Sequence, residues 1–475
     1  MRTEKTLLPL KGKTAVVAGM GRSGIAAARL LKREGADVRA TDARTAEALI
    51  KPLQTLTDLG CETAPGGHPE HLLDGADLLV LSPGVPHTIP FCCRAGEKGV
   101  PVIGEMDLAW RFLSAPAIGV TGSNGKTTTV ELIAEMLRAA GKSVFAGGNI
   151  GTPLSEFILS GQKADWAVVE ISSFQLDTAH IVHPRIAVLL NITEDHLDRY
   201  PGFDAYAASK ARIFRRQTPA DLAVINGRDP RCRAAVQGIA SRVAAFDRDP
   251  ETESCGADLA GNRLILRPVV LYPEPSCPAD MHPAEAEPVE LDLSRSPLAG
   301  RHNRENIAAA ALAALAAGGT PEGVRSAIDG YTCAPHRIQP AGEVDGVRYF
   351  NDSKGTNPDA VSRAVAAMDR PVVLIMGGRG KGNAFDGLAP VLSGRVHTLV
   401  AMGETGPEIA AVLGPAVETV VRATDMADAV AKARSHARAG DAVLLSPGCA
   451  SFDLYASYAA RGEDFIRLSV KKGTP

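Results

Sequence analysis

The hydrophobic and polar positions of the chain repeat one unit, in which a short apolar strand leads through a glycine-containing turn into an amphipathic helix. The first unit pairs a strand at residues 14–20 with a helix at 25–36, and a second strand follows at 37–42. Further apolar strands at 76–84 and 99–105 continue the pattern. Such alternation is typical of α/β folds with a parallel sheet. The first hundred residues therefore predict a small Rossmann-like domain.

A second unit begins at residue 117 with the strand AIGVT, which leads through a turn into a helix with apolar spacing of three and four at 130–141. Strands are expected at 166–172 and 185–193. The proline-rich stretch 250–290 breaks the pattern and predicts an irregular surface excursion or a β-rich flap. We expect this stretch to be peripheral to function.

A third unit follows the alanine-rich run from Asn306, which predicts a closely packed helix. A helix is expected from Met426, and strands at 347–352, 371–378, 398–403 and 442–448. A chain of 475 residues also exceeds what one core usually organises. We therefore expect an α/β protein of three domains: a Rossmann-like domain at 1–104, a central P-loop ATPase-like domain with a parallel sheet at 105–333, and a Rossmann-like α/β domain at 334–475.

Composition excludes several classes of protein. Hydrophobic residues make up 45% of the chain and charged residues 22%, which is enough apolar surface for compact cores. A net charge of -3 gives no basic footprint for nucleic acid. No apolar run reaches the length of a membrane span, and residues 1–13 lack the apolar core of a signal peptide. The eight cysteines form no C-x-x-C pair and are expected to be reduced thiols. We expect a cytoplasmic monomer with no nucleic acid partner and no membrane insertion.

The first glycine-rich turn leaves its ligand open. Gly19, Gly21 and Gly24 match G-x-G-x-x-G between strand and helix, and Asp42 ends the next strand, as in NAD-binding domains. However, glycines let backbone N–H groups approach any diphosphate, and a strand-end carboxylate can bind any sugar hydroxyl. A dinucleotide, another nucleotide diphosphate such as a UDP-sugar, and a purely structural turn therefore remain alternatives.

The second glycine turn indicates phosphate binding more specifically. Gly125, Lys126 and Thr127 stand between a strand and a helix, where backbone donors and the helix dipole favour phosphate. The turn departs from the strict G-x-x-x-x-G-K-[ST] spacing because Val120 replaces the first glycine. We interpret it as a variant P-loop, in which Lys126 contacts the β- and γ-phosphates and Thr127 ligates Mg²⁺. A glycine turn with an incidental surface lysine is the structural alternative.

The string T-G-S-N-G-K-T-T at 121–128 resembles the ATP loop of the Mur ligase family. Further blocks resemble that family in order along nearly the whole chain, at 147–151, 170–176, 191–196, 302–306, 335–337, 351–354 and 446–451. The resemblance implies an ATP-dependent amide-bond ligase that activates a carboxylate as an acyl phosphate and releases ADP and phosphate. An oxidoreductase that uses NAD, or a nucleotide-binding scaffold without turnover, would leave many of these blocks without a role.

The resemblance also implies a catalytic and metal-binding set. Its catalytic residues are Lys126, Glu170, His196 and Lys210. Two Mg²⁺ ions are expected to be held by Thr127, Glu170, His196 and Lys210, with Lys210 modified to a carbamate. Asp195 is expected to support His196. From the residues alone, Glu170 is a strand-end carboxylate, His196 ends a second strand as a core or capping histidine, and Lys210 is a solvated helix lysine. Those simpler interpretations stay open.

The ATP site implied by the resemblance comprises Gly122, Ser123, Asn124, Gly125, Lys126, Thr127, Thr128, Asn306, Arg337 and Asp352. Arg337 follows the expected hinge into the third domain, so it is expected to reach the γ-phosphate when that domain closes.

Within the family, the chain looks like the member that adds D-glutamate to UDP-N-acetylmuramoyl-L-alanine in peptidoglycan synthesis. The sibling that adds a diamino acid usually carries D-N-P-R, and the sibling that adds alanine usually carries G-T-H-G-K in its phosphate loop. Both motifs are absent from this chain. The residues expected to bind the UDP substrate are Gly21, Arg22, Ser23, Asp42, Arg44, Ser82, Gly84 and Asn149. Ala43 departs from the hydroxyl residue that is common there. The residues expected to bind D-glutamate are Lys354, Thr356, Lys381, Ser451, Phe452 and Tyr458, since two carboxylates need cationic and hydroxyl donors.

Overall fold

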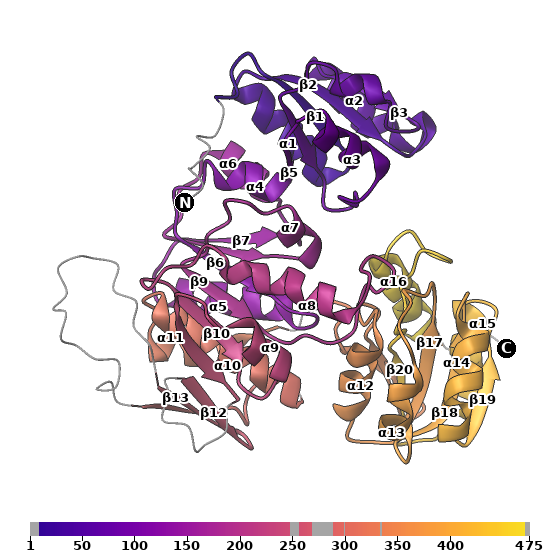
Figure 1. Cartoon of the computed structure of the whole chain (residues 1–475). Coiled ribbons are helices and arrows are strands. Elements are labelled where there is room, and N and C mark those ends of the chain that lie inside the picture. Colours follow the sequence, from indigo (N-terminus) through magenta and orange to yellow (C-terminus); the bar gives the residue numbers. More distant parts are fainter. Residues whose placement is uncertain (1–8, 248–255, 268–287, 299, 333–334, 471–475) are drawn as a thin grey trace.

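The computed structural model describes residues 9–247, 256–267, 288–298, 300–332 and 335–470, which form three α/β units in chain order (Figure 1). Each unit is built on one sheet of five, nine or six strands. The expected three-part α/β architecture is therefore confirmed, whereas the exact boundaries at 104 and 333 stay predictions.

The N-terminal sheet has the order β3-β2-β1-β4-β5 and is parallel throughout. Apolar cores cover both of its faces, as continuous hydrophobic strands require. The strand order reverses between β1 and β4, which is where ligands bind in such sheets. The elements are β1 (Thr14–Ala18), α1 (Arg22–Arg33), β2 (Asp37–Asp42), α2 (Ile50–Asp58), β3 (Glu62–Pro65), β4 (Leu78–Leu81), α3 (Pro90–Glu97), β5 (Val102–Gly104) and α4 (Glu105–Trp110).

The central sheet has the order β14-β13-β12-β11-β10-β9-β6-β8-β7, and only β12, β13 and β14 pair antiparallel. Its strands are β6 (Ala117–Thr121), β7 (Val144–Gly148), β8 (Trp166–Glu170), β9 (Ile186–Leu189), β10 (Leu222–Asn226), β11 (Arg242–Phe246), β12 (Gly256–Ala260), β13 (Arg263–Arg267) and β14 (Val289–Asp292). Its helices are α5 (Lys126–Ala139), α6 (Leu154–Ser160), α7 (Ser173–Asp177), α8 (Phe203–Ala211), α9 (Pro230–Ala235), α10 (Arg301–Ala316) and α11 (Pro321–Gly330).

Part of the 250–290 stretch is more regular than the irregular alternative predicted. Strands β12 and β13 extend the central sheet, and Ala257, Leu264 and Leu266 are fully buried in its core. Leu264 and Leu266 of RLILR point into the core and alternate with less buried neighbours, as in a strand, so the β-rich alternative holds for β12 and β13 and for the start of β14. Residues 250–255 and 268–287 lie outside the described residues.

The C-terminal sheet has the order β15-β16-β20-β17-β18-β19, with only β15 antiparallel to its neighbour. The carboxyl ends of β16, β20 and β17 therefore lie side by side. The elements are β15 (Gln339–Val344), β16 (Val347–Asn351), α12 (Pro358–Ala366), β17 (Val372–Gly377), α13 (Ala389–Leu392), β18 (Val396–Met402), α14 (Gly406–Leu413), β19 (Thr419–Arg422), α15 (Met426–His436), β20 (Ala442–Leu445) and α16 (Tyr458–Val470).

Two composition-based expectations can be compared with this fold. The five cysteines that the structure describes are free, and only Cys93 among them is exposed. Across the described ranges, no helix combines the length and the apolar character needed to cross a membrane.

Candidate nucleotide and ligation site

The turn between β6 and α5 is pressed against helix α10. Gly125 has a φ of 88°, and a Cβ atom at this position would lie 2.2 Å from Asn306 Oδ1. Only glycine fits such a left-handed conformation and such a close approach. Lys126, the first residue of α5, donates from Nζ to the carbonyl oxygens of Gly122 and Ser123, both at 2.8 Å. Burial lowers the pKa of Lys126. In the predicted P-loop, the side chain of Lys126 therefore folds back over the turn that precedes it, and this turn carries the backbone N–H donors.

Glu170 stands at the carboxyl end of β8 and is almost completely buried. Its Oε2 accepts a 2.8 Å hydrogen bond from Thr127 Oγ1, and its Oε1 accepts one of 2.9 Å from Asn149 Nδ2. Asn149, which is expected at the UDP substrate, thus contacts the predicted metal ligand, and its role towards the substrate stays a prediction.

His196 does not end a strand, because β9 stops at Leu189 and the residues that follow form a loop. Its φ of 56° is unusual for a residue other than glycine. Residues with such backbone conformations cluster at functional sites. Burial lowers the pKa of His196 to about 3, so the imidazole is neutral near pH 7 and keeps a lone pair for a metal. The ring of Phe174 packs edge-on against it at 4.9 Å.

Lys210 is not a solvated helix lysine: its side chain is 2% exposed. Nζ donates to the Gly122 carbonyl at 2.8 Å and lies 4.5 Å from the Tyr206 ring centre. Burial, together with the charge of Lys126, lowers the pKa of Lys210 well below its ordinary value. A lowered pKa favours the neutral amine, which is the nucleophile that carbamylation by CO₂ requires.

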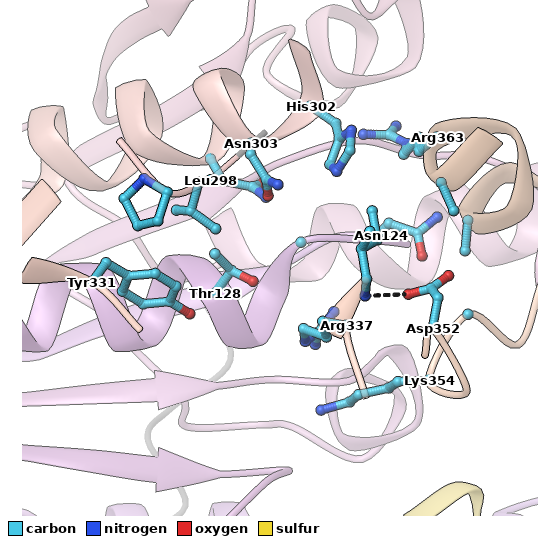
Figure 2. Close-up of a pocket in the computed structure, with 17 residues that line it drawn as sticks. Asn124, Thr128, Leu298, His302, Asn303, Tyr331, Arg337, Asp352, Lys354 and Arg363 are labelled. Carbon is cyan, nitrogen blue, oxygen red and sulfur yellow. Dashed lines mark hydrogen bonds between the residues drawn. The ribbon is translucent and has the colours of Figure 1, made fainter. Parts of the chain in front are cut away.

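A cavity between the central and C-terminal units collects most of the predicted ATP residues (Figure 2). Asn124, Gly125, Thr128, Asn306, Arg337 and Asp352 line it, as does Lys354, which was assigned to D-glutamate. Burial raises the pKa of Asp352 to about 7, and Arg337 Nε is buried without a hydrogen-bond partner. Arg337 lines this cavity, and a guanidinium group with an unused N–H donor is suited to bind an anion.

Other residues of this cavity were missed by sequence reasoning. Tyr331 donates a 2.6 Å hydrogen bond to Glu131, and His302 and Arg363 lie on the opposite wall in Figure 2. His302 belongs to a matching block, which was a usable signal. Nothing in the local sequence sets Tyr331 apart.

The predicted D-glutamate residues surround the carboxyl ends of the C-terminal strands and reach the central unit. Lys354 Nζ lies 3.3 Å from Thr127 Oγ1 and 5.4 Å from the Tyr458 ring centre. Lys381 Nζ donates to Thr356 Oγ1 at 3.1 Å and approaches Asp195 Oδ1 at 3.4 Å. Ser451 is buried, whereas Phe452 is 63% exposed.

Asp195 links the two units and was foreseen only as support for His196. Its Oδ2 accepts a 3.0 Å hydrogen bond from Asn357 Nδ2, which lies 162 residues further along the chain. Burial would raise the pKa of Asp195, but Lys381 and the other cations lower it to about 2, so the carboxylate is ionised. The cationic pocket of the third unit is thereby held against the loop that carries His196.

A second cavity, of about 600 Å³, opens at the switch point of the N-terminal sheet, within the range of roughly 300–1,000 Å³ that is typical of small-molecule sites. Its polar end is formed by five predicted residues, Gly21, Asp42, Arg44, Ser82 and Gly84. Its apolar wall is formed by Val85, Pro86, Ile89 and Phe91 together with His68. None of these wall residues was predicted.

Asp42 orders the polar end of this cavity. Its carboxylate accepts hydrogen bonds from Met20 N at 2.7 Å and from the Arg44 side chain, and its pKa is lowered to about 2 because these bonds outweigh burial. Arg22 and Ser23 do not line the cavity; the guanidinium of Arg22 bonds to Glu156 and to the Gly151 carbonyl. Ala43 lines the cavity without a side-chain donor.

The described residues contain no group of three or more His, Cys, Asp or Glu side chains arranged to hold a metal. Mg²⁺ is usually bound by one or two carboxylates together with substrate phosphates. Glu170 with Thr127 meets that requirement, and neutral His196 beside the buried Lys210 amine fits a second ion once the amine carries a carboxylate.

Comparison with known proteins gives full-length relatives. Three domain families match: the Mur ligase MurD-like N-terminal domain at 13–104, the Mur ligase middle domain at 120–314 and the Mur ligase glutamate ligase domain at 336–449. The chain is 44% identical to the UDP-N-acetylmuramoylalanine–D-glutamate ligase of Desulfosudis oleivorans, over 97% of both chains. It is 45% identical to the enzyme of the same name from Desulfatibacillum aliphaticivorans, over 97% of this chain and 99% of the other.

A solved structure shares the fold along nearly the whole chain. The pseudomurein peptide ligase type C from Methanothermus fervidus superimposes with a TM-score of 0.59 at 19% identity, covering 97% of this chain and 100% of that one.

Proposed function

Because the chain belongs to the Mur ligase family, with a MurD-like N-terminal domain, we propose that it joins D-glutamate to UDP-N-acetylmuramoyl-L-alanine at the expense of ATP. The observation that carries the proposal is the meeting of Lys126, Glu170 and Lys354 at one junction. Lys354 from the third unit lies 3.3 Å from the Thr127 hydroxyl, which in turn bonds to Glu170. A phosphate-binding loop and a cationic pocket for an acidic substrate thus share one reaction space.

The first step of the proposed reaction is phosphoryl transfer. A carboxylate oxygen of the alanyl substrate attacks the γ-phosphorus of ATP, the bond to the β-phosphate oxygen breaks, and ADP leaves. Lys126 and Arg337 carry positive charge to the phosphate oxygens, where charge spreads in the transition state. Arg337 is suited to this role because its Nε is buried and unpaired at the cavity.

Two Mg²⁺ ions fit the predicted ligands, with Thr127 and Glu170 for one, and His196 and carbamylated Lys210 for the other. When bound, they would neutralise the negative charge of the phosphates. The chain's own contribution is to fix these side chains: Asn149 holds one oxygen of Glu170, and the Gly122 carbonyl holds the Lys210 amine.

The second step forms the amide. The amino group of D-glutamate attacks the acyl phosphate carbon, phosphate leaves with the bonding electron pair, and the nitrogen loses a proton. Lys381, Thr356 and Lys354 supply donors for the two D-glutamate carboxylates. Burial lowers the pKa of Lys354 to about 8, so this side chain is still mostly charged at pH 7.

The uridine diphosphate end is assigned to the N-terminal cavity. Gly19 N and Met20 N already donate to Thr41 and Asp42, so the backbone N–H groups of Gly21 and of the start of α1 would face the diphosphate. The apolar wall around Phe91 and His68 would take the base. An NAD-dependent reaction would use the same turn but would give no role to Lys126, Glu170 or the third unit.

The proposal is tested by ADP release with UDP-N-acetylmuramoyl-L-alanine and a panel of D- and L-amino acids, together with absorbance controls with NAD. Release that needs both cosubstrates and is fastest with D-glutamate supports the proposal. Preference for L-alanine, a diamino acid or a dipeptide would assign the chain to another branch of the family. Binding of ATP without any release would identify a scaffold.

A further inference from the structure

We infer that Arg461 is a positioning residue that sets the geometry of the amino-acid pocket from behind, without touching the substrate. Arg461 lies in the first turns of α16, and its side chain is among the largest fully buried ones in the described chain. The inference deepens the proposed function and rests on it, since it concerns the pocket assigned to D-glutamate.

The guanidinium group reaches the ends of three neighbouring strands. After β16, it bonds to Ser353, from Nε to the hydroxyl at 3.0 Å and from Nη2 to the carbonyl at 2.9 Å. After β20, it bonds to the carbonyls of Cys449 and Ala450 at 3.1 and 3.3 Å, and at the last residue of β17 it bonds to the carbonyl of Gly377 at 3.5 Å. One planar group therefore ties together three loops that follow adjacent strands.

Each of these loops carries a residue assigned to D-glutamate. Ser353 precedes Lys354, Ala450 precedes Ser451, and Gly377 begins the glycine-containing loop that leads to Lys381. Backbone hydrogen bonds between Arg379 and Ala450 already join two of the loops. The segment after β16 is also joined to the loop after β20, since Gly448 N donates to the Gly355 carbonyl at 2.9 Å. What Arg461 adds is one group that bonds to all three segments and so holds Ser353, next to Lys354, against the other two.

The chemistry of the contacts argues against an ordinary buried ion pair. All acceptors that Arg461 contacts within the described chain are carbonyl or hydroxyl oxygens. A buried charge is normally matched by a carboxylate. Here burial lowers the pKa of Arg461 to about 10, so the group remains charged at pH 7. Its positive charge lies behind a pocket that is expected to receive a dianion, whose charge complements it.

The geometry also explains why a lysine cannot substitute. An ammonium group donates from a single atom, whereas the fork of the guanidinium donates in three directions. Arg461→Lys should thus keep the charge but lose the connection between the loops.

The test is steady-state kinetics on the full chain with ATP, UDP-N-acetylmuramoyl-L-alanine and D-glutamate. Arg461→Lys should raise KM for D-glutamate about tenfold or more and leave KM for ATP within about twofold, because loops displaced by fractions of an ångström misplace the carboxylate donors. Ser353→Ala removes the Nε acceptor together with the 2.8 Å hydrogen bond from Ser353 Oγ to the Tyr458 carbonyl, leaves the other Arg461 contacts in place, and should raise the same KM about threefold. Arg434→Lys is the matched control, since Arg434 also bonds to carbonyl oxygens of the third unit, those of Leu468 and Ser469.

A purely structural role would lower thermal stability in Arg461→Lys and Arg434→Lys alike and leave every KM unchanged. An unchanged KM for D-glutamate in folded Arg461→Lys, or in Ser353→Ala if the former does not fold, would overturn the inference. Failure of the unmodified chain to ligate D-glutamate would instead contradict the proposed function.

Discussion

Thr127 Oγ1 donates a 2.8 Å hydrogen bond to Glu170 Oε2, which joins the phosphate loop to the end of the neighbouring strand β8. The two groups are 43 residues apart in sequence, and both are buried. A hydroxyl and a carboxylate held together at the start of a helix make a compact ligand pair for a cation that also binds phosphate. This pair leads to the first prediction.

Glu170→Gln keeps the size of the side chain but removes its charge, so it should weaken Mg²⁺ binding. We expect the Mg²⁺ concentration for half-maximal ADP release to rise at least about tenfold, and turnover to fall by about 10² or more. The measurement is the rate of ADP release across a Mg²⁺ titration. Glu135→Gln, an exposed change on α5, is the control, and identical Mg²⁺ curves for all three proteins would refute the assignment.

Lys126→Ala should cost about 10³ in rate, because a cation preorganised at the transferring phosphate acts in a water-poor site. Its Nζ contacts only loop carbonyls, so the fold should survive. Turnover is compared with that of Lys163→Ala, which removes an exposed lysine. Near-normal turnover in folded Lys126→Ala would end this assignment.

Lys210 should work as a carbamate rather than as an ammonium, because a cation beside Mg²⁺ would repel the metal. Lys210→Ala should be nearly inactive, yet a short-chain carboxylic acid in the buffer should enter the vacated space and restore part of the rate. Lys210→Arg keeps its charge, fills that space and should not be rescued.

The three proteins are compared with and without added acid, alongside the intact mass of the unmodified chain under bicarbonate. Full activity of Lys210→Ala without added acid would remove the carbamate from the mechanism.

Asp352 should make the fold less stable as pH rises. Burial raises its pKa to about 7, above the value of about 3.9 in an unfolded chain. The native state then binds more protons than the unfolded state between about pH 4 and 7, so the stability contributed by the protonated acid is lost across that window, on the order of 4 kcal/mol.

Asp352→Asn, which mimics the protonated acid towards Ser446 and Ile338, should flatten this decline. The check is the urea midpoint of unfolding from pH 4.5 to 8, with exposed Asp345→Asn as control. Parallel pH profiles for the Asp352→Asn and unmodified proteins would show that the carboxyl titrates normally.

The apolar strands, the glycine turns and the order of the three units followed from local sequence, because strand period and turn chemistry are local properties. The contacts across units did not. Asp195 and Asn357 meet only because the third unit packs on the loop after β9, and Arg22 turns to Glu156 because the first unit packs on α6. A motif shows which residue types are present; only tertiary packing decides which partner each side chain takes, as Asn149 on Glu170 illustrates.

The central claim is that ATP activates a carboxylate of the alanyl substrate, and the fate of that carboxylate's oxygen tests it most directly. The substrate is prepared with ¹⁸O in the alanyl carboxylate and turned over with ATP and D-glutamate, and the released phosphate is analysed by mass. Transfer through an acyl phosphate puts one ¹⁸O atom into each phosphate released. Phosphate free of ¹⁸O, released at the rate of amide formation, would contradict the account.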